Sequence, residues 1–374
     1  MHDREPLHVA LLPLDRAFDI LRSEWAGENA AATDDPTLSD AYLRIWWRYF
    51  GTPGSDAILA LMTPAETVVG LLFTRMETEV YGRMPVRVIR CWVNGHAQRA
   101  GLFLRCDPNK AAQAIAAYWA SNRRRWDLLR LQGLPEGDFA DALLQHARAR
   151  RGRGTVARRW AHSVLNIEEP WETYLRSRIS TDTRKEVERQ GRRLAQVAAV
   201  DFQIRESVEA VSAAMKDFAT IELGSWKKEA GEVLASQPAI AGFYQDVFTT
   251  FAARGMAAVA TLRVGDTPIC AVLGLRTDRR LLALKTSFDE RYAKYSPGSQ
   301  LFKHLIEHSF GRGFTEFDFY GMMSFSQRWS KQVRGFVDLE IEGSTLRSRS
   351  VGMVKAARRW WRDRRQGRHA AVTR

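Results

Sequence analysis

Residues suited to binding a phosphorylated ligand gather around position 297. The sequence from 285 to 301 predicts a strand, a short basic and aromatic loop, and a helix that begins at Pro297 with Ser296 as its N-cap. The first N–H groups of a helix have no acceptors within it and carry a partial positive charge. We therefore expect this helix start to hold a pyrophosphate, although an ordinary Ser-Pro helix start would look the same. The residues expected at the site are Arg291, Ser296, Pro297, Gly298 and Ser299, with Lys294 beside them.

The elements that position this helix repeat an earlier part of the chain. The later strands are predicted at 256–264, 268–275, 281–287 and 314–319; the segment 325–333 then takes the place of the second helix of the repeat, and a closing strand follows at 337–341. The earlier strands are predicted at 57–62, 67–74, 86–93 and 126–131. The helix of the earlier copy begins at Pro108 with Asp107 as its N-cap, and another helix follows at 139–150. Because the order repeats after about 200 residues, it predicts a tandem duplication.

The duplication predicts an α/β protein with mixed central sheets flanked by helices. The predicted segments are an N-terminal domain at 1–168, a helical connector at 169–200, a C-terminal domain at 201–346 and a basic tail at 347–374. In the connector, Thr183 and Glu186 form a capping box that starts a second helix. The first copy lacks the Gly-Ser pair after its helix-starting proline, so its ligand site is expected to be degenerate.

An ordered series of short motifs resembles the GNAT (Gcn-related N-acetyltransferase) superfamily. The nearest branch is the CelD/BcsL-like acyltransferases associated with exopolysaccharide and cellulose biosynthesis, which are relatives of the Fem peptidyltransferases. The matching pieces of the second copy are Glu222 with Ser225-Trp226-Lys227, Phe243-Tyr244, 285–289, Ser296-Pro297-Gly298, 317–321 and Trp329. Upstream, Trp171-Glu172 with Tyr174-Leu175 and the segment 126–131 also match, so the resemblance covers most of residues 35–345.

The resemblance implies two GNAT-like domains, of which the second binds acyl-CoA, with acetyl-CoA as the expected donor and no metal. It implies transfer of the acyl group to an amino or hydroxyl group of a sugar or lipid-linked glycan in exopolysaccharide biosynthesis. Trp226, Lys227 and Lys285 would contact the acceptor, although Lys285 could equally be an exposed strand lysine. Many relatives carry Tyr-Lys before the closing tryptophan. This chain lacks that lysine, and Arg328 or Lys331 could take its place.

Attack on a thioester requires a base, a site for the oxyanion and a proton for the leaving thiolate. The candidate bases are Glu222, Asp289 and Asp318, and the candidate acid is Tyr320. Asp318 lies between Phe317 and Phe319, and an apolar surrounding would favour its protonated form. The alternative is a carboxylate that caps the following loop. Tyr320 could equally be a packed tyrosine, and Cys270 is expected to be a small core residue.

Three other functions fit parts of the sequence. A Fem-like transfer from aminoacyl-tRNA uses the same chemistry. The segment 304–308 reads H-x-x-E-H, a signature of zinc hydrolases. However, Leu301, Leu305 and Ile306 mark the buried side of that helix and leave His304 and His308 on its polar side, so no metal is expected. A non-catalytic nucleic-acid-binding protein is the third alternative, because the net charge is +13.

The positive charge lies mainly in the tail. Residues 347–374 hold ten basic residues and one acid, a net of +9, so the body of the protein is not expected to bind nucleic acid. The tail, with Trp360 and Trp361 among arginines, could lie on an anionic membrane surface. No apolar run reaches the roughly 18 residues of a membrane helix, and residues 1–6 do not resemble a signal peptide. With three scattered cysteines, we expect a cytoplasmic protein, peripheral to the inner membrane through its tail.

Overall fold

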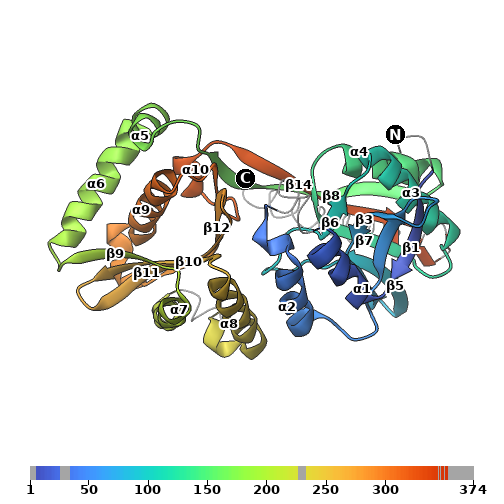
Figure 1. The fold of residues 1–374 in the computed structure, drawn as a ribbon, viewed down its shortest axis with the longest axis horizontal. Coiled ribbons are helices and arrows are strands. Elements are labelled where there is room, and N and C mark those ends of the chain that lie inside the picture. Colours follow the sequence, from blue (N-terminus) through green and yellow to red (C-terminus); the bar gives the residue numbers. More distant parts are fainter. Residues whose placement is uncertain are drawn as a thin grey trace, which may run out of the picture. The chain divides into compact units, whose positions relative to one another are not determined.

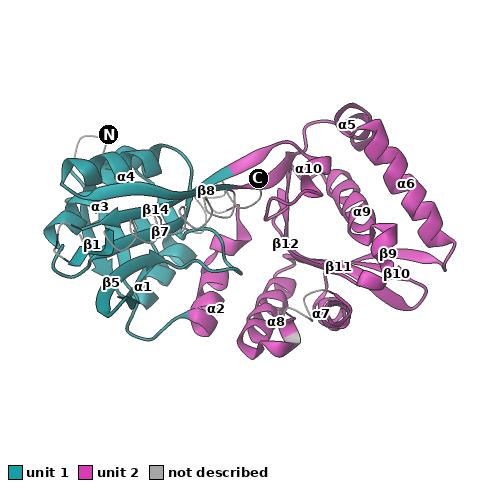
Figure 2. Cartoon of the chain, turned by 180° about the vertical axis from the view of Figure 1, so that it is seen from behind, with its two compact units in different colours: residues 1–25, 51–160, 335–374 teal, residues 26–50, 161–334 magenta. Residues whose placement is uncertain are grey.

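The chain folds into two compact units (Figure 2). The computed structural model describes residues 6–25, 34–225 and 233–343, together with 345, 347–348 and 350–352. Unit 1 takes its described residues from 1–25, 51–160 and 335–374, and unit 2 takes them from 26–50 and 161–334. Two long strands, β8 (Arg153–Asn166) and β14 (Val333–Glu342), have residues in both units.

Unit 1 combines strands of two sheets with a pair of packed helices. Its elements are β1 (His8–Leu12), α1 (Leu14–Asp19), η1 (Ile20–Glu24), β2 (Ile58–Met62), β3 (Val68–Leu72), β4 (Thr74–Tyr81), β5 (Met84–Cys91), β6 (Leu102–Leu104), α3 (Pro108–Ser121), β7 (Leu128–Pro135) and α4 (Asp138–Ala149). One antiparallel sheet has the order β1-β2-β3-β6, and the other contains β4-β5-β7-β14 with β5 and β7 parallel. Ile115 of α3 and Leu143 of α4 belong to one buried apolar cluster with Leu129 and Leu131 of β7.

Unit 2 is a sheet with helices on both faces. Its elements are η2 (Pro36–Leu38), α2 (Asp40–Phe50), α5 (Trp171–Arg178), α6 (Thr181–Ala195), β9 (Val200–Arg205), α7 (Val208–Leu223), η3 (Leu234–Ser236), α8 (Pro238–Ala253), β10 (Ala257–Val264), β11 (Thr267–Arg276), β12 (Arg280–Phe288), η4 (Glu290–Tyr295), α9 (Pro297–Gly311), β13 (Glu316–Asp318) and α10 (Ser326–Trp329). The strand order is β8-β13-β12-β11-β10-β9, with β12 and β13 parallel. Helices α6 and α9 cover one face of this sheet, and α7 and α8 cover the other (Figure 1).

The predicted strand-helix-strand core of the second copy is confirmed. Leu301, Leu305 and Ile306 of α9 are buried against the sheet, because apolar residues three and four positions apart share one helix face. The Phe302 ring lies 5.6 Å from that of Phe319 between ring centroids. In unit 1, α3 connects the parallel strands β5 and β7 in the same manner. Each unit therefore contains a crossover in which a helix connects two parallel strands.

Some predicted elements are wrong. The segment 325–333 holds only the short helix α10 before β14 begins at Val333; Phe325 packs on Phe302, and the Trp329 carbonyl accepts a 2.5 Å hydrogen bond from the Tyr174 hydroxyl. The sequence analysis did not predict β4, β8 and β9; charged residues occupy much of β4 and β8, whereas β9 (V-D-F-Q-I-R) has a regular apolar–polar alternation that was overlooked. Helix α6 begins at Thr181. Its N-cap is Ser180, whose hydroxyl accepts from the Thr183 N–H, so the predicted capping box lies three residues too late.

The two units are not contiguous in sequence, unlike the predicted segments 1–168 and 201–346. Helix α2 belongs to unit 2 because it packs on α8, where Arg48 and Tyr49 both bind Asp246. Strand β14 carries the chain back into unit 1 because it pairs with β7. The segment 169–200, predicted as a connector, is part of unit 2: Val187 and Leu194 of α6 are buried in its core.

Candidate active site

The parallel strands of unit 2 separate at one end. Pairing between β12 and β13 covers Arg280–Leu282 of β12 and Glu316–Asp318 of β13, where β13 ends. Strand β12 continues to Phe288 and remains paired with β11 on its other side. The edge of β12 from 283 to 288 therefore lies beyond its pairing with β13 and faces an opening in the sheet, and a strand edge of this kind can pair with an extended ligand. The buried Ser287 hydroxyl at this end has no hydrogen-bond partner among the described residues.

Helix α9 begins beside this opening without a side-chain cap. Ser296 is at the N-cap position, as predicted, but its backbone is left-handed (φ 51°, ψ 54°) and its side chain makes no capping hydrogen bond. This conformation is costly for a residue other than glycine. A Cβ atom added to Gly298 would have no other atom within 4 Å, so the first turn is open to a ligand. An uncapped helix start with its N–H groups exposed can bind a phosphate.

The cationic side chains expected beside this helix start have different partners. The Arg291 guanidinium binds the carboxylate of Asp289, with an Nη2–Oδ2 distance of 2.5 Å, and its side chain is 76% exposed. Lys294 Nζ lies 5.1 Å from the ring centroid of Tyr295, and the guanidinium carbon of Arg193 in α6 lies 5.8 Å from the same centroid. Arg193 therefore joins Lys294 next to the helix start.

The corresponding helix start in unit 1 is closed. The Asp107 carboxylate accepts from the Lys110 N–H at 2.8 Å and so puts a negative charge where a phosphate would bind. The end of β7 is also covered, since the Ala100 N–H donates to the Gly133 carbonyl at 2.9 Å. A Cβ at Gly133 would lie 2.2 Å from the Gln98 carbonyl oxygen, and Gly133 has a φ of +69°.

Polar residues gather on the α7 and α8 side of the unit 2 sheet. Glu222 of α7 is 1% exposed; its Oε2 accepts from the Leu234 N–H at 2.8 Å, and its Oε1 lies 3.5 Å from Lys285 Nζ. Lys285 Nζ lies 5.5 Å from the ring centroid of Tyr244. Burial raises the pKa of Tyr244, and the charges of Tyr320 and Glu222 raise it further.

Asp318 lies in an ionic surrounding, so the predicted apolar surrounding is wrong. Its Oδ2 accepts from Arg334 at 3.0 Å, and its Oδ1 accepts from the Tyr320 N–H at 2.8 Å. That second bond is the loop cap considered as the alternative. The buried imidazole of His162 has its Nδ1 3.9 Å from Asp318 Oδ1, and its ring centroid lies 5.0 Å from that of Tyr320. Tyr320 has a left-handed backbone (φ 48°), which this carboxylate helps to fix.

Asp289 is occupied by its own loop. Its side chain accepts from the Arg291 guanidinium and from the Arg291 N–H, and these hydrogen bonds hold the pKa of the Asp289 carboxyl below its usual value. A carboxylate with a lowered pKa and a permanent cationic partner is a weak proton acceptor. Asp289 therefore holds the loop before α9 in place, and the structure brings Glu222 and Lys285 together without it.

The remaining predicted residues divide into those outside and those inside the described part. Trp226 and Lys227 lie outside the described residues, as does most of the tail. His304 and His308 are half-buried, not fully exposed as predicted; the His304 ring stacks on Phe202, and burial lowers the pKa of both imidazoles. Within the described ranges, no group of three or more His, Cys, Asp or Glu side chains could hold a metal ion. Cys270 is buried in the core, as predicted.

Three residues of this cluster were missed by the sequence analysis: His162, Arg334 and, as a functional group, Tyr244. His162 and Arg334 lie on strands that follow arginine-rich or irregular sequence, and only the pairing of β8 with β13 brings His162 to Asp318. Tyr244 was noted as part of a motif, and its position next to Lys285 was the missing information.

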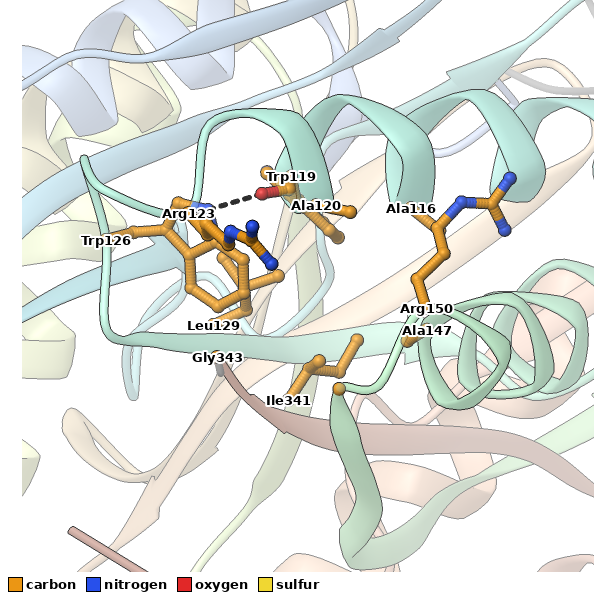
Figure 3. Close-up of a pocket in the computed structure, with 11 residues that line it drawn as sticks. Ala116, Trp119, Ala120, Arg123, Trp126, Leu129, Ala147, Arg150, Ile341 and Gly343 are labelled. Atoms are coloured by element: carbon orange, nitrogen blue, oxygen red, sulfur yellow. Dashed lines mark hydrogen bonds between the residues drawn. The ribbon is translucent and has the colours of Figure 1, made fainter. Parts of the chain in front are cut away.

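A separate cavity lies in unit 1 between α3 and α4 (Figure 3). Its walls are mainly apolar, including Trp119, Trp126 and Ile341, with Arg123 and Arg150 also lining it. The Trp126 Nε1–H donates to the Trp119 carbonyl at 3.0 Å. The cavity lies at the C-terminal ends of α3 and α4, where helix carbonyl groups disfavour an anion, and none of the predicted site residues lines it.

Comparisons with known proteins agree with this geometry. Residues 181–326 match the family model described as an acetyltransferase (GNAT) domain. The fold is similar to the C-terminal domain of a candidate lysylphosphatidylglycerol synthetase from Agrobacterium fabrum (11% identity, 90% of this chain and 94% of that chain, TM-score 0.51). It is also similar to a protein of unknown function from Bacteroides thetaiotaomicron (7%, 90% and 99%, 0.53) and to FemX (10%, 88% and 96%, 0.50). No curated protein matches the sequence.

These findings establish the fold and one domain. The chain has a mixed α/β fold similar to those of the structures named above, and residues 181–326 of unit 2 match a GNAT acetyltransferase domain model. None of the helices within the described residues is long and apolar enough to span a membrane.

Proposed function

We propose that unit 2 transfers an acyl group, in the simplest case acetyl, from acyl-CoA to an amino or hydroxyl group. The contrast between the two helix starts carries this proposal. Helix α9 begins uncapped beside an opening in the sheet, whereas α3 is capped by Asp107 and its sheet opening is covered. A pyrophosphate fits the N–H groups of α9, and the pantetheine amides fit the free edge of β12. The match of residues 181–326 to the GNAT domain supports the same donor.

The proposed reaction needs two proton transfers. The acceptor nitrogen or oxygen attacks the thioester carbonyl carbon, a C–N or C–O bond forms, and the C–S bond breaks. We assign Glu222 as the group that takes the acceptor proton, because it lies with Lys285 on the α7 and α8 side of the opening. We assign Tyr320 as the donor of a proton to the leaving thiolate. Asp318 then positions Tyr320 through its backbone N–H, and Lys285 contacts the acceptor or holds Glu222.

The proposed acceptor is an amino or hydroxyl group of a sugar or lipid-linked glycan, as in exopolysaccharide assembly. This part rests on the motif resemblance alone. The buried and half-buried polar groups around Lys285 and Tyr244 provide hydrogen-bonding partners that a sugar could use. The basic tail, with its membrane contact, belongs to the same proposal and lies almost wholly outside the described residues.

Two measurements, made one after the other, test the proposed function. Calorimetric titration with acetyl-CoA and CoA should show one site per chain. Release of free thiol from acetyl-CoA should then depend on an added acceptor, tested with amino sugars and with sugars that carry hydroxyl groups only. Hydroxylamine at alkaline pH cleaves an ester product and leaves an amide, so it separates O- from N-acylation. Absence of CoA binding to the folded protein would refute the proposed donor.

A further inference from the structure

A groove of about 380 Å³ lies between α6 and α9 in unit 2, outside the residues assigned above. This volume is within the range of roughly 300–1,000 Å³ that small-molecule sites have. Its apolar floor includes Leu194 and Leu262, which are fully buried, and Val200, which is 39% exposed. The exposed apolar surface of Val200, supported by the two buried leucines, can pack against a nucleotide base. All of these residues belong to unit 2.

The two helices are held at a fixed spacing along this groove. The buried side-chain amide of Gln300 donates to the Val187 carbonyl at 2.7 Å. Gly191 permits this approach, since a Cβ there would lie 3.0 Å from Gln300 Oε1. The groove is therefore a feature of the helix packing and exists without a ligand.

Two cations from different helices line the groove. Arg192 of α6 and Lys303 of α9 make no ion pair or side-chain hydrogen bond among the described residues, whereas Arg189, one turn earlier on α6, binds Glu186 at 2.8 Å. Glu188 also lines the groove, and His304 has a pKa lowered by burial, so the lining keeps a net positive charge at neutral pH. Such a lining favours an anionic group.

The groove continues from the open start of α9. Ser299 of the first turn and Lys303 share one helix face, and four residues of α-helix rise about 6 Å. A ribose that carries a pyrophosphate at one carbon and a phosphate at another can span this distance of about 6 Å. A pyrophosphate at Gly298 and Ser299 would then leave a second phosphate near Lys303 and Arg192, with the base over Val200.

We propose that this groove binds the nucleotide end of the donor and that Arg192 and Lys303 recognise a phosphate on its ribose. The inference rests on the proposed function, because it takes the donor to be a CoA thioester. It makes unit 2 selective for 3′-phosphorylated CoA over dephospho-CoA. Helix α6 lies between β8 and β9 in the chain, so the chain supplies this subsite from outside the β10–β13 core.

Calorimetric titration with CoA and with dephospho-CoA tests this subsite. The unaltered protein should bind CoA at least about tenfold more tightly, which corresponds to about 1.4 kcal/mol. In the R192Q/K303Q variant the two ligands should bind equally, with the dephospho-CoA affinity unchanged. The control variant K185Q/R189Q removes two charges from the exposed face of α6 and should keep the tenfold preference.

The outcomes separate this inference from the proposed function. Equal binding of the two ligands by the unaltered protein, or a preference that survives in R192Q/K303Q, overturns the subsite while leaving the donor site intact. A preference lost equally in the control would mean that general charge, and not the groove, attracts the phosphate. If neither ligand binds the unaltered protein, the proposed donor is wrong and the subsite is wrong with it.

Discussion

Replacing Gly298 with valine should block the donor without disturbing the fold. A Cβ at this position meets no other atom within 4 Å, so the side chain would project into open space above the first turn of α9. Valine has a slightly higher helix propensity than glycine, so the free energy of unfolding should change by only a few tenths of a kcal/mol. The added methyl groups would occupy the space through which a phosphate reaches the N–H groups of Gly298 and Ser299.

The expected loss of affinity follows from the bonds that valine prevents. A hydrogen bond to a charged group is worth about 1.5–3 kcal/mol, so exclusion from even one N–H should weaken CoA binding by at least tenfold. Calorimetry with CoA measures this loss, and urea unfolding measures the stability of each variant. The product of acyl transfer at saturating donor should form at a nearly unchanged rate, because Gly298 is remote from Glu222 and Lys285 in the proposed reaction.

Gly311 provides the matched control. It is the last residue of α9, and a Cβ there also meets nothing within 4 Å. Gly311→Val therefore makes the same substitution on the same helix at the opposite end, and it should bind CoA as the unaltered protein does. If Gly298→Val folds and binds CoA with unchanged affinity, the start of α9 is not the donor site and the argument from the uncapped helix fails.

Four further outcomes are expected. Tyr320→Phe should lower the rate of acyl transfer by about 10²–10⁴-fold at unchanged CoA affinity, and an equal loss in both would contradict an acid role. Asp289→Asn should reduce the free energy of unfolding at neutral pH, and this difference should shrink as the pH falls through the lowered pKa of Asp289, because a depressed acid stabilises the fold only while ionised; urea unfolding from pH 7 to pH 3 measures it. His304→Ala with His308→Ala should destabilise the fold by more than the about 0.5 kcal/mol of surface sites, since His304 stacks on Phe202; stoichiometric zinc in the unaltered protein, lost with this change, would contradict this purely structural role. Truncation after Ser344 should abolish sedimentation with anionic vesicles while soluble turnover persists, and vesicle binding by the truncated protein would exclude the tail as the membrane contact.

The sequence predicted those parts of the fold in which local pattern and packing agree. Alternating or continuous apolar runs marked β10, β11 and β12, and the spacing of Leu301, Leu305 and Ile306 marked α9. Strand β8 escaped prediction because several arginines occupy it and its stability comes from pairing on both sides. The order of the strands, and the return of β14 to unit 1, depend on long-range pairing that no local pattern specifies.

The candidate site was predictable in its residue types and less so in their partners. Pro297 and Gly298 stood out because helix starts have sequence signals. The ionic partners of Asp289 and Asp318 could not be predicted from the sequence. Arg291 is close to Asp289 in the chain, but only the geometry shows that it binds this carboxylate instead of a ligand. Arg334, the partner of Asp318, belongs to a distant strand. A carboxylate between two phenylalanines on a strand faces away from both, because neighbouring strand residues point to opposite faces. This alternation explains why Asp318 meets Arg334 while Phe317 and Phe319 pack on α9.

The starts of helices α3 and α9 differ in how they are stabilised. In unit 1, the Asp107 cap contributes about 1 kcal/mol to the stability of α3, as side-chain caps usually do. In unit 2, α9 has no such cap, and the left-handed Ser296 costs roughly another 1 kcal/mol or more. A fold retains a strained, uncapped helix start where another requirement outweighs stability, and an anionic ligand is the group that such a start can bind. Unit 1 has the capped helix start and a covered sheet, so under the proposed function it would serve as scaffold while unit 2 binds the donor.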